Sequence, residues 1–217
     1  HRGVGYAVKS SNRHFWVKDD EHPYSVEPGT DYDWLRGYHL GGRSVTWGRQ
    51  SYRLSDIDFE ANKKESIAID WPIRYKDIAR WYDHVERFAG IAGANEGLEQ
   101  LPDGIFQPPF ALTDAELAFK TGVERSFPGR RVIHARVAHL TEPTEAQTAL
   151  GRQACQARNI CALGCTFKAY FSSLNATLPA ALRTGNTTIK TDSLVTSLNH
   201  DATTGQITGV NVLDQKT

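Results

Sequence analysis

Apolar side chains recur at helical spacing in two stretches of the chain. The first stretch follows Pro72 and predicts a helix that Gly90 ends. The second begins at Thr113, where Glu116 completes a capping box, and its helix is expected to run to about Phe127. The pattern therefore predicts two helices separated by a long connection rich in glycine and proline.

The second half of the chain combines helical and strand-like signals. A third helix is expected from about Ser172 to Arg183, with Pro179 near a bend or at a late start and Gly185 as the stop signal. Residues 131–140 predict a strand. Further strand-like segments are 187–190, 193–198 and 207–213, and residues 201–205 are expected to join the last two as a hairpin. Segments 1–33, 94–112 and 141–169 predict loops.

Composition narrows the class of protein. The chain has 217 residues, 40% of them hydrophobic and 23% charged, as is ordinary for a globular protein. Lys+Arg and Asp+Glu both number 25, so no basic field attracts nucleic acid or an anionic membrane. No apolar run approaches the roughly 18 residues of a membrane span. The chain starts at His1 and lacks methionine, so we expect an internal fragment of a longer protein.

The segment from Arg36 to Gly48 carries the strongest candidate for chemistry in the first half. Gly41 and Gly42 are adjacent, and paired glycines permit unusual backbone conformations and close approach of a ligand. Ser44 adds a hydroxyl, and exposed N–H groups in such a loop bind anions. By itself, this pattern does not separate a ligand-binding loop from an ordinary turn.

The run Arg36-Gly37-Tyr38-His39-Leu40-Gly41-Gly42-Arg43-Ser44 resembles the Gly-rich motif of the glucose–methanol–choline (GMC) oxidoreductases. The run from Asp70-Trp71-Pro72-Ile73 through Tyr82 and Glu86 is similar to a helix of the same family. The resemblance implies an FAD site formed by Arg36, Gly41, Gly42, Ser44, Trp47 and Gly48. For Trp47, core packing is the alternative role. Some members bond flavin covalently through a histidine in this loop. Thr46 stands at the matching position, so noncovalent FAD is expected.

Three cysteines lie within eleven residues, spaced C-x5-C-x3-C at Cys155, Cys161 and Cys165. An odd, clustered set is a poor disulfide framework, whereas three thiolates suit a metal cluster with three ligands. A zinc site would need a fourth ligand, for which His134, His139 or His200 are candidates. The spacing is also compatible with a single disulfide or with three inert buried thiols.

The cysteine spacing is similar to that of bacterial sugar and sugar-acid dehydrogenase large subunits within the GMC family. In those proteins the three cysteines hold a 3Fe–4S cluster. The resemblance implies that Cys155, Cys161 and Cys165 would bind such a cluster and relay electrons from flavin to an external acceptor. Thr166 departs from the pattern, because many such sequences have proline there.

The terminal β segment is similar to an antiparallel three-stranded piece of GMC enzymes, in which a valine contacts adenine through its backbone. The resemblance assigns this role to Val195, which is also an ordinary apolar strand residue. The dinucleotide fingerprint GxGxxG is missing from the chain. No histidine matches the family's catalytic base, so no catalytic residue is expected here.

The expected fold is an α+β fragment of a two-domain α/β FAD-binding flavoprotein. Residues 1–69 would form the FAD-contacting loop region. Residues 70–150 would border the substrate domain, and residues 151–217 would hold the cysteines and the β piece of the FAD domain. Because such a fragment leaves sheet edges and a flavin pocket open, we expect poor stability in isolation.

The resemblance implies oxidation of a CH–OH group of a sugar, glycoside or sugar acid, by hydride transfer to FAD. Expected partners are the small-molecule substrate and an electron-acceptor subunit or cytochrome, without nucleic acid. The alternative is a truncated relative that no longer holds FAD and serves as a binding or scaffold module. The sequence leaves the compartment open between the cytoplasm and the periplasm of a bacterium.

Overall fold

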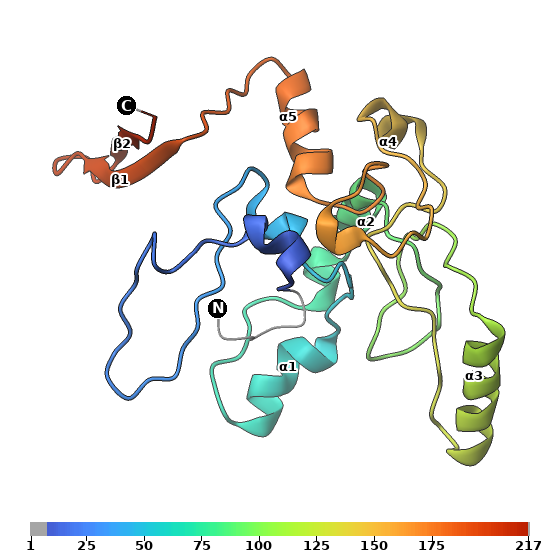
Figure 1. The fold of residues 1–217 in the computed structure, drawn as a ribbon. Coiled ribbons are helices and arrows are strands. Elements are labelled where there is room, and N and C mark those ends of the chain that lie inside the picture. Colours follow the sequence, from blue (N-terminus) through green and yellow to red (C-terminus); the bar gives the residue numbers. More distant parts are fainter. Residues whose placement is uncertain (1–7, 217) are drawn as a thin grey trace. The chain divides into compact units, whose positions relative to one another are not determined.

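The computed structural model describes residues 8–216, and the chain forms two compact units, His1–Ala180 and Ala181–Thr217. Short helices are joined by long irregular segments (Figure 1). The expected ranges 1–69 and 70–150 both lie in the first unit, and 151–217 crosses the boundary between the units. The expected ranges were defined by their roles in a flavoprotein, so the division into two units leaves them as predictions.

Two predicted helices are confirmed. Helix α2 spans Tyr75–Ala89 and ends at Gly90, whose φ of 74° lies in the left-handed region that glycine adopts without strain. Helix α3 spans Asp114–Ser126, and the Thr113 hydroxyl accepts a hydrogen bond from the Glu116 backbone N–H. The capping box therefore starts the helix where the sequence indicated.

The third predicted helix is also confirmed, with a change of type along its length. A π-helical turn covers Ser173–Thr177, with Ser172 as its N-cap, and α5 continues over Leu178–Arg183. Pro179 is the second residue of α5, directly after the π-helical turn. The change of helix type falls next to this proline, and the expected bend stays a prediction.

Two α-helices were missed, as were short 3-10 helices at Ser10–Phe15 and Cys161–Leu163, in segments expected to be loops. Helix α1 spans Asp56–Glu65 and α4 spans Glu145–Ala149. Each begins with a capping box, in which Ser55 pairs with Asp58 in α1 and Thr144 with Gln147 in α4. These capping boxes were the sequence signal that could have located both helices.

The prediction of strands at residues 131–140 and 187–190 is wrong. Residues 131–140 pair with other segments as isolated β-bridges, such as Val137 with Gln50 and Ala92, and not as a continuous ladder. A strand needs a continuous partner, and the neighbours of this segment are irregular loops. Residues 187–190 are likewise without strand structure.

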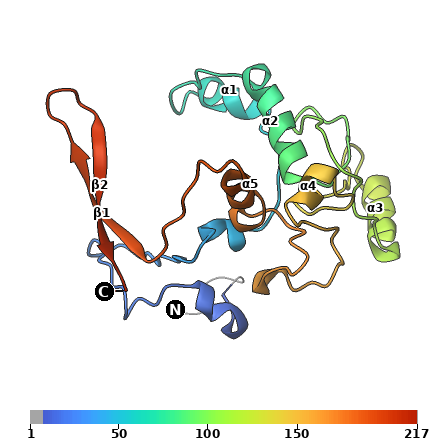
Figure 2. The same ribbon diagram turned by 90° about the horizontal axis from the view of Figure 1, so that it is seen from above.

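The hairpin is confirmed. Strands β1 (Ser193–His200) and β2 (Ile207–Asp214) pair antiparallel, and they lie side by side in Figure 2. In the connecting turn, the carboxylate of Asp201 accepts hydrogen bonds from the N–H groups of Thr203 and Thr204. Within residues 8–216 the sheet has two strands.

The core of the first unit gathers at the C-terminal end of α2. Ala89, Ile91 and Ala138 are buried together, and Trp47, Phe106 and Phe171 pack against them. The core thus joins the end of α2 to four other segments of the chain, at Trp47, Phe106, Ala138 and Phe171. Among the described residues, no helix is both long and apolar enough to cross a membrane.

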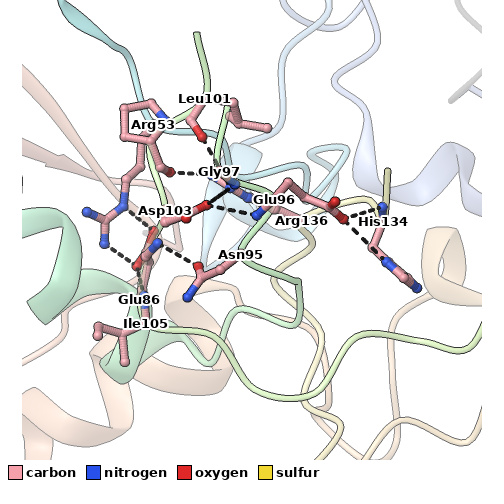
Figure 3. A network of polar contacts seen from close by, with 12 residues as sticks. Arg53, Glu86, Asn95, Glu96, Gly97, Leu101, Asp103, Ile105, His134 and Arg136 are labelled. Atoms are coloured by element: carbon pink, nitrogen blue, oxygen red, sulfur yellow. Dashed lines mark hydrogen bonds and ion pairs between the residues drawn. The ribbon is translucent and has the colours of Figure 1, made fainter. Parts of the chain in front are cut away.

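A polar network holds the loop at residues 95–105 in place (Figure 3). The Asp103 carboxylate accepts hydrogen bonds from the N–H groups of Glu96 and Gly97 at 2.9 and 3.1 Å. Arg136 is fully buried and donates to the carbonyl of Pro102 at 2.7 Å. The side chains of segment 131–136 are therefore used to anchor this loop.

Candidate functional site

The Gly-rich loop is built around a tight turn at Gly41. Gly41 has a φ of 90°, and a short 3-10 helix follows over Gly42–Val45. A Cβ on Gly41 would lie 2.9 Å from Val45 Cγ2 and 3.1 Å from the Cβ of Leu174. Glycine is thus required here both by backbone conformation and by close packing.

Ser44 fastens the loop to the turn that begins the π-helical segment. The Ser44 hydroxyl donates to the carbonyl of Gly41 at 2.6 Å and accepts from the backbone N–H of Ser173 at 2.9 Å. The Ser173 hydroxyl also donates to the Gly41 carbonyl, at 3.2 Å. The hydroxyl proposed from sequence for a cofactor is therefore engaged inside the protein.

Arg36 organises the segment that precedes the loop. It is 5% exposed, pairs with Asp19 at 3.0 Å and donates to the carbonyl of His22. Its guanidinium also lies 4.7–5.9 Å from the ring centres of three aromatic residues, Tyr24, Trp34 and Tyr38. These contacts give Arg36 a structural role, and a contact with FAD stays a prediction.

Trp47 occupies the core position that was the alternative to flavin contact. Its indole N–H donates to the carbonyl of Phe171 at 2.8 Å, and the two rings meet edge to face. Gly48, the next residue, is exposed. The end of the loop is thus fixed by packing on one side and open on the other.

The loop keeps unused hydrogen-bonding capacity. Several buried nitrogens of the described chain have no hydrogen-bond partner, and three of them lie on this loop or directly after it: Arg36 Nε, His39 Nε2 and Arg49 Nε. A Cβ on Gly42 would meet no atom within 4 Å, so the backbone is open at this residue. The loop therefore combines an open glycine backbone with buried nitrogens whose hydrogen-bonding capacity is unused.

The cysteines are free, and each is half-buried. The N–H of Cys155 donates to the carbonyl of Leu140 at 2.8 Å, and the carbonyl of Cys161 accepts from Arg49 at 3.1 Å. Within residues 8–216, no three His, Cys, Asp or Glu side chains are grouped so as to hold a metal ion. As placed, Cys155, Cys161 and Cys165 do not fit a 3Fe–4S cluster, which stays an untested prediction.

A cavity of about 610 Å³ lies beside the cysteines, a volume typical of small-molecule sites. Its walls are mostly apolar, and the residues that line it also include His139, Arg158, Cys155 and Cys161. The apolar part comes from Phe110, Leu112, Phe119, Val132, Ile133 and Val137. The sequence patterns did not indicate this cavity, because its walls come from separate segments of the chain.

His139 is the titratable group of this cavity with the clearest perturbation. Burial, together with the positive charge of Arg49, lowers its pKa to about 4. Its Nε2 is buried without a hydrogen-bond partner in the described chain. The ring lies 6.3 Å from those of Phe110 and Tyr170. His139 is therefore neutral at physiological pH.

Comparison with curated proteins finds two similar to this chain. It is 30% identical over 129 residues to paromamine 6'-oxidase of Streptomyces fradiae. This alignment covers 57% of this chain and 21% of that protein. It is 24% identical to 6'''-hydroxyparomomycin C oxidase of Streptomyces lividus, over an alignment covering 100% of this chain and 38% of that protein. No protein-family model matches. The chain thus spans well under half the length of these relatives.

The structure brings together only some of the residues singled out from sequence. Gly41 and Ser44 lie against the turn at Ser173, and Cys155 and Cys161 line one cavity. Val195 lies on β1, paired with Val212, in the second unit. Because that sheet has two strands among the described residues, the expected middle-strand position is not formed by them.

Proposed function

We propose that this chain is part of an FAD-dependent oxidoreductase of the GMC type that oxidises a CH–OH group of a sugar, glycoside or sugar acid. The observation that carries the proposal is similarity along the entire chain to a protein named as a hydroxyparomomycin oxidase. The second relative is also named as an oxidase, of paromamine. Both names indicate amino-sugar substrates, so we include amino sugars in the substrate class.

The Gly-rich loop is the proposed FAD-binding element of this chain. Gly42 would let the cofactor approach the backbone, while Gly41 and Ser44 would shape the loop from inside. Arg36, Trp47 and Gly48 would complete this wall, and Val195 would contact adenine through its backbone. When bound, FAD would accept the hydride from the substrate carbon. Thr46 has no nucleophilic ring nitrogen, so the binding would be noncovalent.

Two electron acceptors are compatible with the proposal. The names of the relatives favour molecular oxygen, whereas the cysteine spacing favours an acceptor subunit or cytochrome. No acid or base for the reaction is assigned to this chain. The catalytic groups would lie in other parts of the complete enzyme.

The experiment is a flavin assay on the whole natural protein. Visible absorbance reports bound flavin, and acid precipitation separates noncovalent FAD, which enters the supernatant, from covalent FAD, which does not. Anaerobic addition of glucose, gluconate or paromamine should bleach the flavin band. If none of the three compounds bleaches the flavin band, the proposed substrate class is contradicted. If the protein contains no flavin, the non-catalytic alternative is favoured.

A matched pair of glycine variants tests the loop. Gly42 and Gly29 both have positive φ, 51° and 85°, and a Cβ on either meets no atom within 4 Å. Gly42→Ala should lower flavin occupancy at least tenfold, whereas Gly29→Ala should keep it. Equal flavin occupancy in the two variants would show that the Gly-rich loop does not form part of the FAD site.

A further inference from the structure

Two of the three cysteines share a setting that the third does not. Cys155 and Cys161 both line the 610 Å³ cavity, and Cys165 does not. All three thiols are free and half-buried. The structure therefore divides a cluster that looks uniform in the sequence into a pair and a single residue.

Residues 156–160, the connector between Cys155 and Cys161, form a short and tightly turned segment. Ala157 and Asn159 have φ values of 50° and 53°, in the left-handed region that side chains other than glycine rarely adopt. Both cysteines and the connector residues Ala157, Arg158 and Asn159 thus line one cavity.

Both ends of the connector are anchored while its middle is exposed. The N–H of Cys155 is held by the Leu140 carbonyl, and the Cys161 carbonyl is held by Arg49. Residues 156–160 are exposed and form neither helix nor strand. An irregular exposed segment between fixed ends can adjust locally, and closing so short a loop costs little chain entropy.

We propose that Cys155 and Cys161 form a peroxide-sensitive thiol pair that closes to a disulfide at the wall of the cavity. A peroxide is the oxidant: its O–O bond breaks, one thiol becomes a sulfenic acid, and water leaves. The second thiol then attacks the sulfenic sulfur, the S–S bond forms, the S–O bond breaks, and a second water leaves with the thiol proton. Closure fixes the wall that carries Arg158 and links the shape of the cavity to redox state.

The pair does not depend on the proposed flavin chemistry, because the peroxide can be supplied from outside. It gives a use to thiols that do not fit a metal cluster as placed within residues 8–216. The two functions are separable, since a flavin assay and a thiol assay report on different groups.

The test is peptide mapping by mass spectrometry of the whole natural protein, reduced and then exposed to hydrogen peroxide. We expect a Cys155–Cys161 cross-linked peptide that dithiothreitol reverses, with Cys165 still open to alkylation. Cys165→Ser should keep the cross-link. Cys155→Ser and Cys161→Ser should each abolish it and leave the remaining partner as a sulfenic acid.

Three outcomes would overturn the proposal. One is survival of all three free thiols after peroxide treatment, and another is a cross-link that uses Cys165. The third is iron in anaerobically purified protein, with a low-temperature EPR signal lost in Cys165→Ser as well as in Cys161→Ser. Because the map is made on the unsubstituted protein, the proposal stays testable even if a serine variant fails to fold.

Discussion

The carboxylate of Glu86 on α2 accepts a hydrogen bond from Arg53 Nε at 2.8 Å, and both side chains are buried. Glu86 also accepts from the N–H of Ile105 at 2.8 Å, so one carboxylate joins α2 to two loops. Burial by itself lowers the pKa of Arg53, but hydrogen bonds to Glu86, Asp83 and Tyr75 outweigh it, and the net pKa is raised. The guanidinium of Arg53 thus stays charged.

Removing the charge of Glu86 should destabilise the fold. Glu86→Gln leaves the buried guanidinium of Arg53 poorly compensated, and the expected loss in free energy of unfolding is about 3 kcal/mol. Asp83→Asn is the control, because Asp83 pairs with the same guanidinium from a side chain that is 36% exposed. It should cost less than about 1 kcal/mol. Urea denaturation measures both, and equal losses would contradict the role given to burial.

The adjacent glycines of the Gly-rich loop should differ in their tolerance of alanine. Gly41→Ala adds a clash with Val45 and Leu174 to an unfavourable φ, so we expect a loss of about 2–4 kcal/mol. Gly42→Ala meets open space and should cost about 1 kcal/mol from its backbone conformation alone. Thermal and urea unfolding of the two variants measure the difference. A larger loss for Gly42→Ala would show that the packing around Gly41 is misassigned.

The hydroxyls of Ser44 and Ser173 should be energetically coupled. The two hydroxyl oxygens lie 2.5 Å apart, and both hydroxyls lie within hydrogen-bonding distance of the Gly41 carbonyl. In a double-mutant cycle with Ser44→Ala and Ser173→Ala, we expect a coupling energy of about 1 kcal/mol. Thr121→Ala on α3, combined with Ser44→Ala, is the control and should be additive. If the stability losses of Ser44→Ala and Ser173→Ala simply add, the two hydroxyls do not interact and the proposed link between loop and turn is contradicted.

His139 should make stability fall in acid. Its folded pKa is about 4, below the ordinary value of 6.5, so the unfolded chain takes up a proton first as pH falls. Its contribution is fully present above pH 6.5 and is lost progressively between pH 6.5 and about 4. Allowing for partial exposure, we expect a loss on the order of 1–2 kcal/mol. The comparison is urea unfolding at several pH values across this window.

His139→Gln removes the titrating ring and should flatten that part of the pH profile. His84, which is exposed on α2, provides the control variant His84→Gln. Identical profiles for the His139→Gln variant and the unsubstituted protein would show that the ring is not held neutral by its surroundings.

The hairpin should be the least protected element of the 217-residue chain when that chain is prepared alone. Two-stranded hairpins are marginally stable in water, and the apolar side chains of both strands are exposed. These side chains are Leu194, Val195, Leu198, Ile207, Val210, Val212 and Leu213. Amides of β1 and β2 should therefore exchange with solvent much faster than those of α2. Equal protection, with a single cooperative melt, would contradict the expected poor stability in isolation.

Local signals in the sequence located three helices and the hairpin. The capping box at Thr113 and the glycine stop at Gly90 act over a few residues, and the structure has both where expected. The same kind of signal at Ser55 was present but unused. The strand predicted at 131–140 failed because an extended pattern does not say whether a continuous partner exists.

The candidate site was less accessible to sequence. The glycines of the loop were recognisable, but nothing local showed that Ser44 would bind Ser173, 129 positions away. The buried side chains of Arg36 and Arg136 could not be foreseen either, because charged residues are usually exposed.

The sequence by itself determined the elements whose physics is local: where helices start and stop, where the hairpin turns, and that three thiols lie within eleven residues. The tertiary structure alone decided which thiols share a cavity, which arginines are buried, and which nitrogens of the described chain lack partners. The physical reason is that capping and turn formation depend on neighbours in the chain. Burial, cavity walls and ion pairs depend instead on contacts between segments far apart in the sequence.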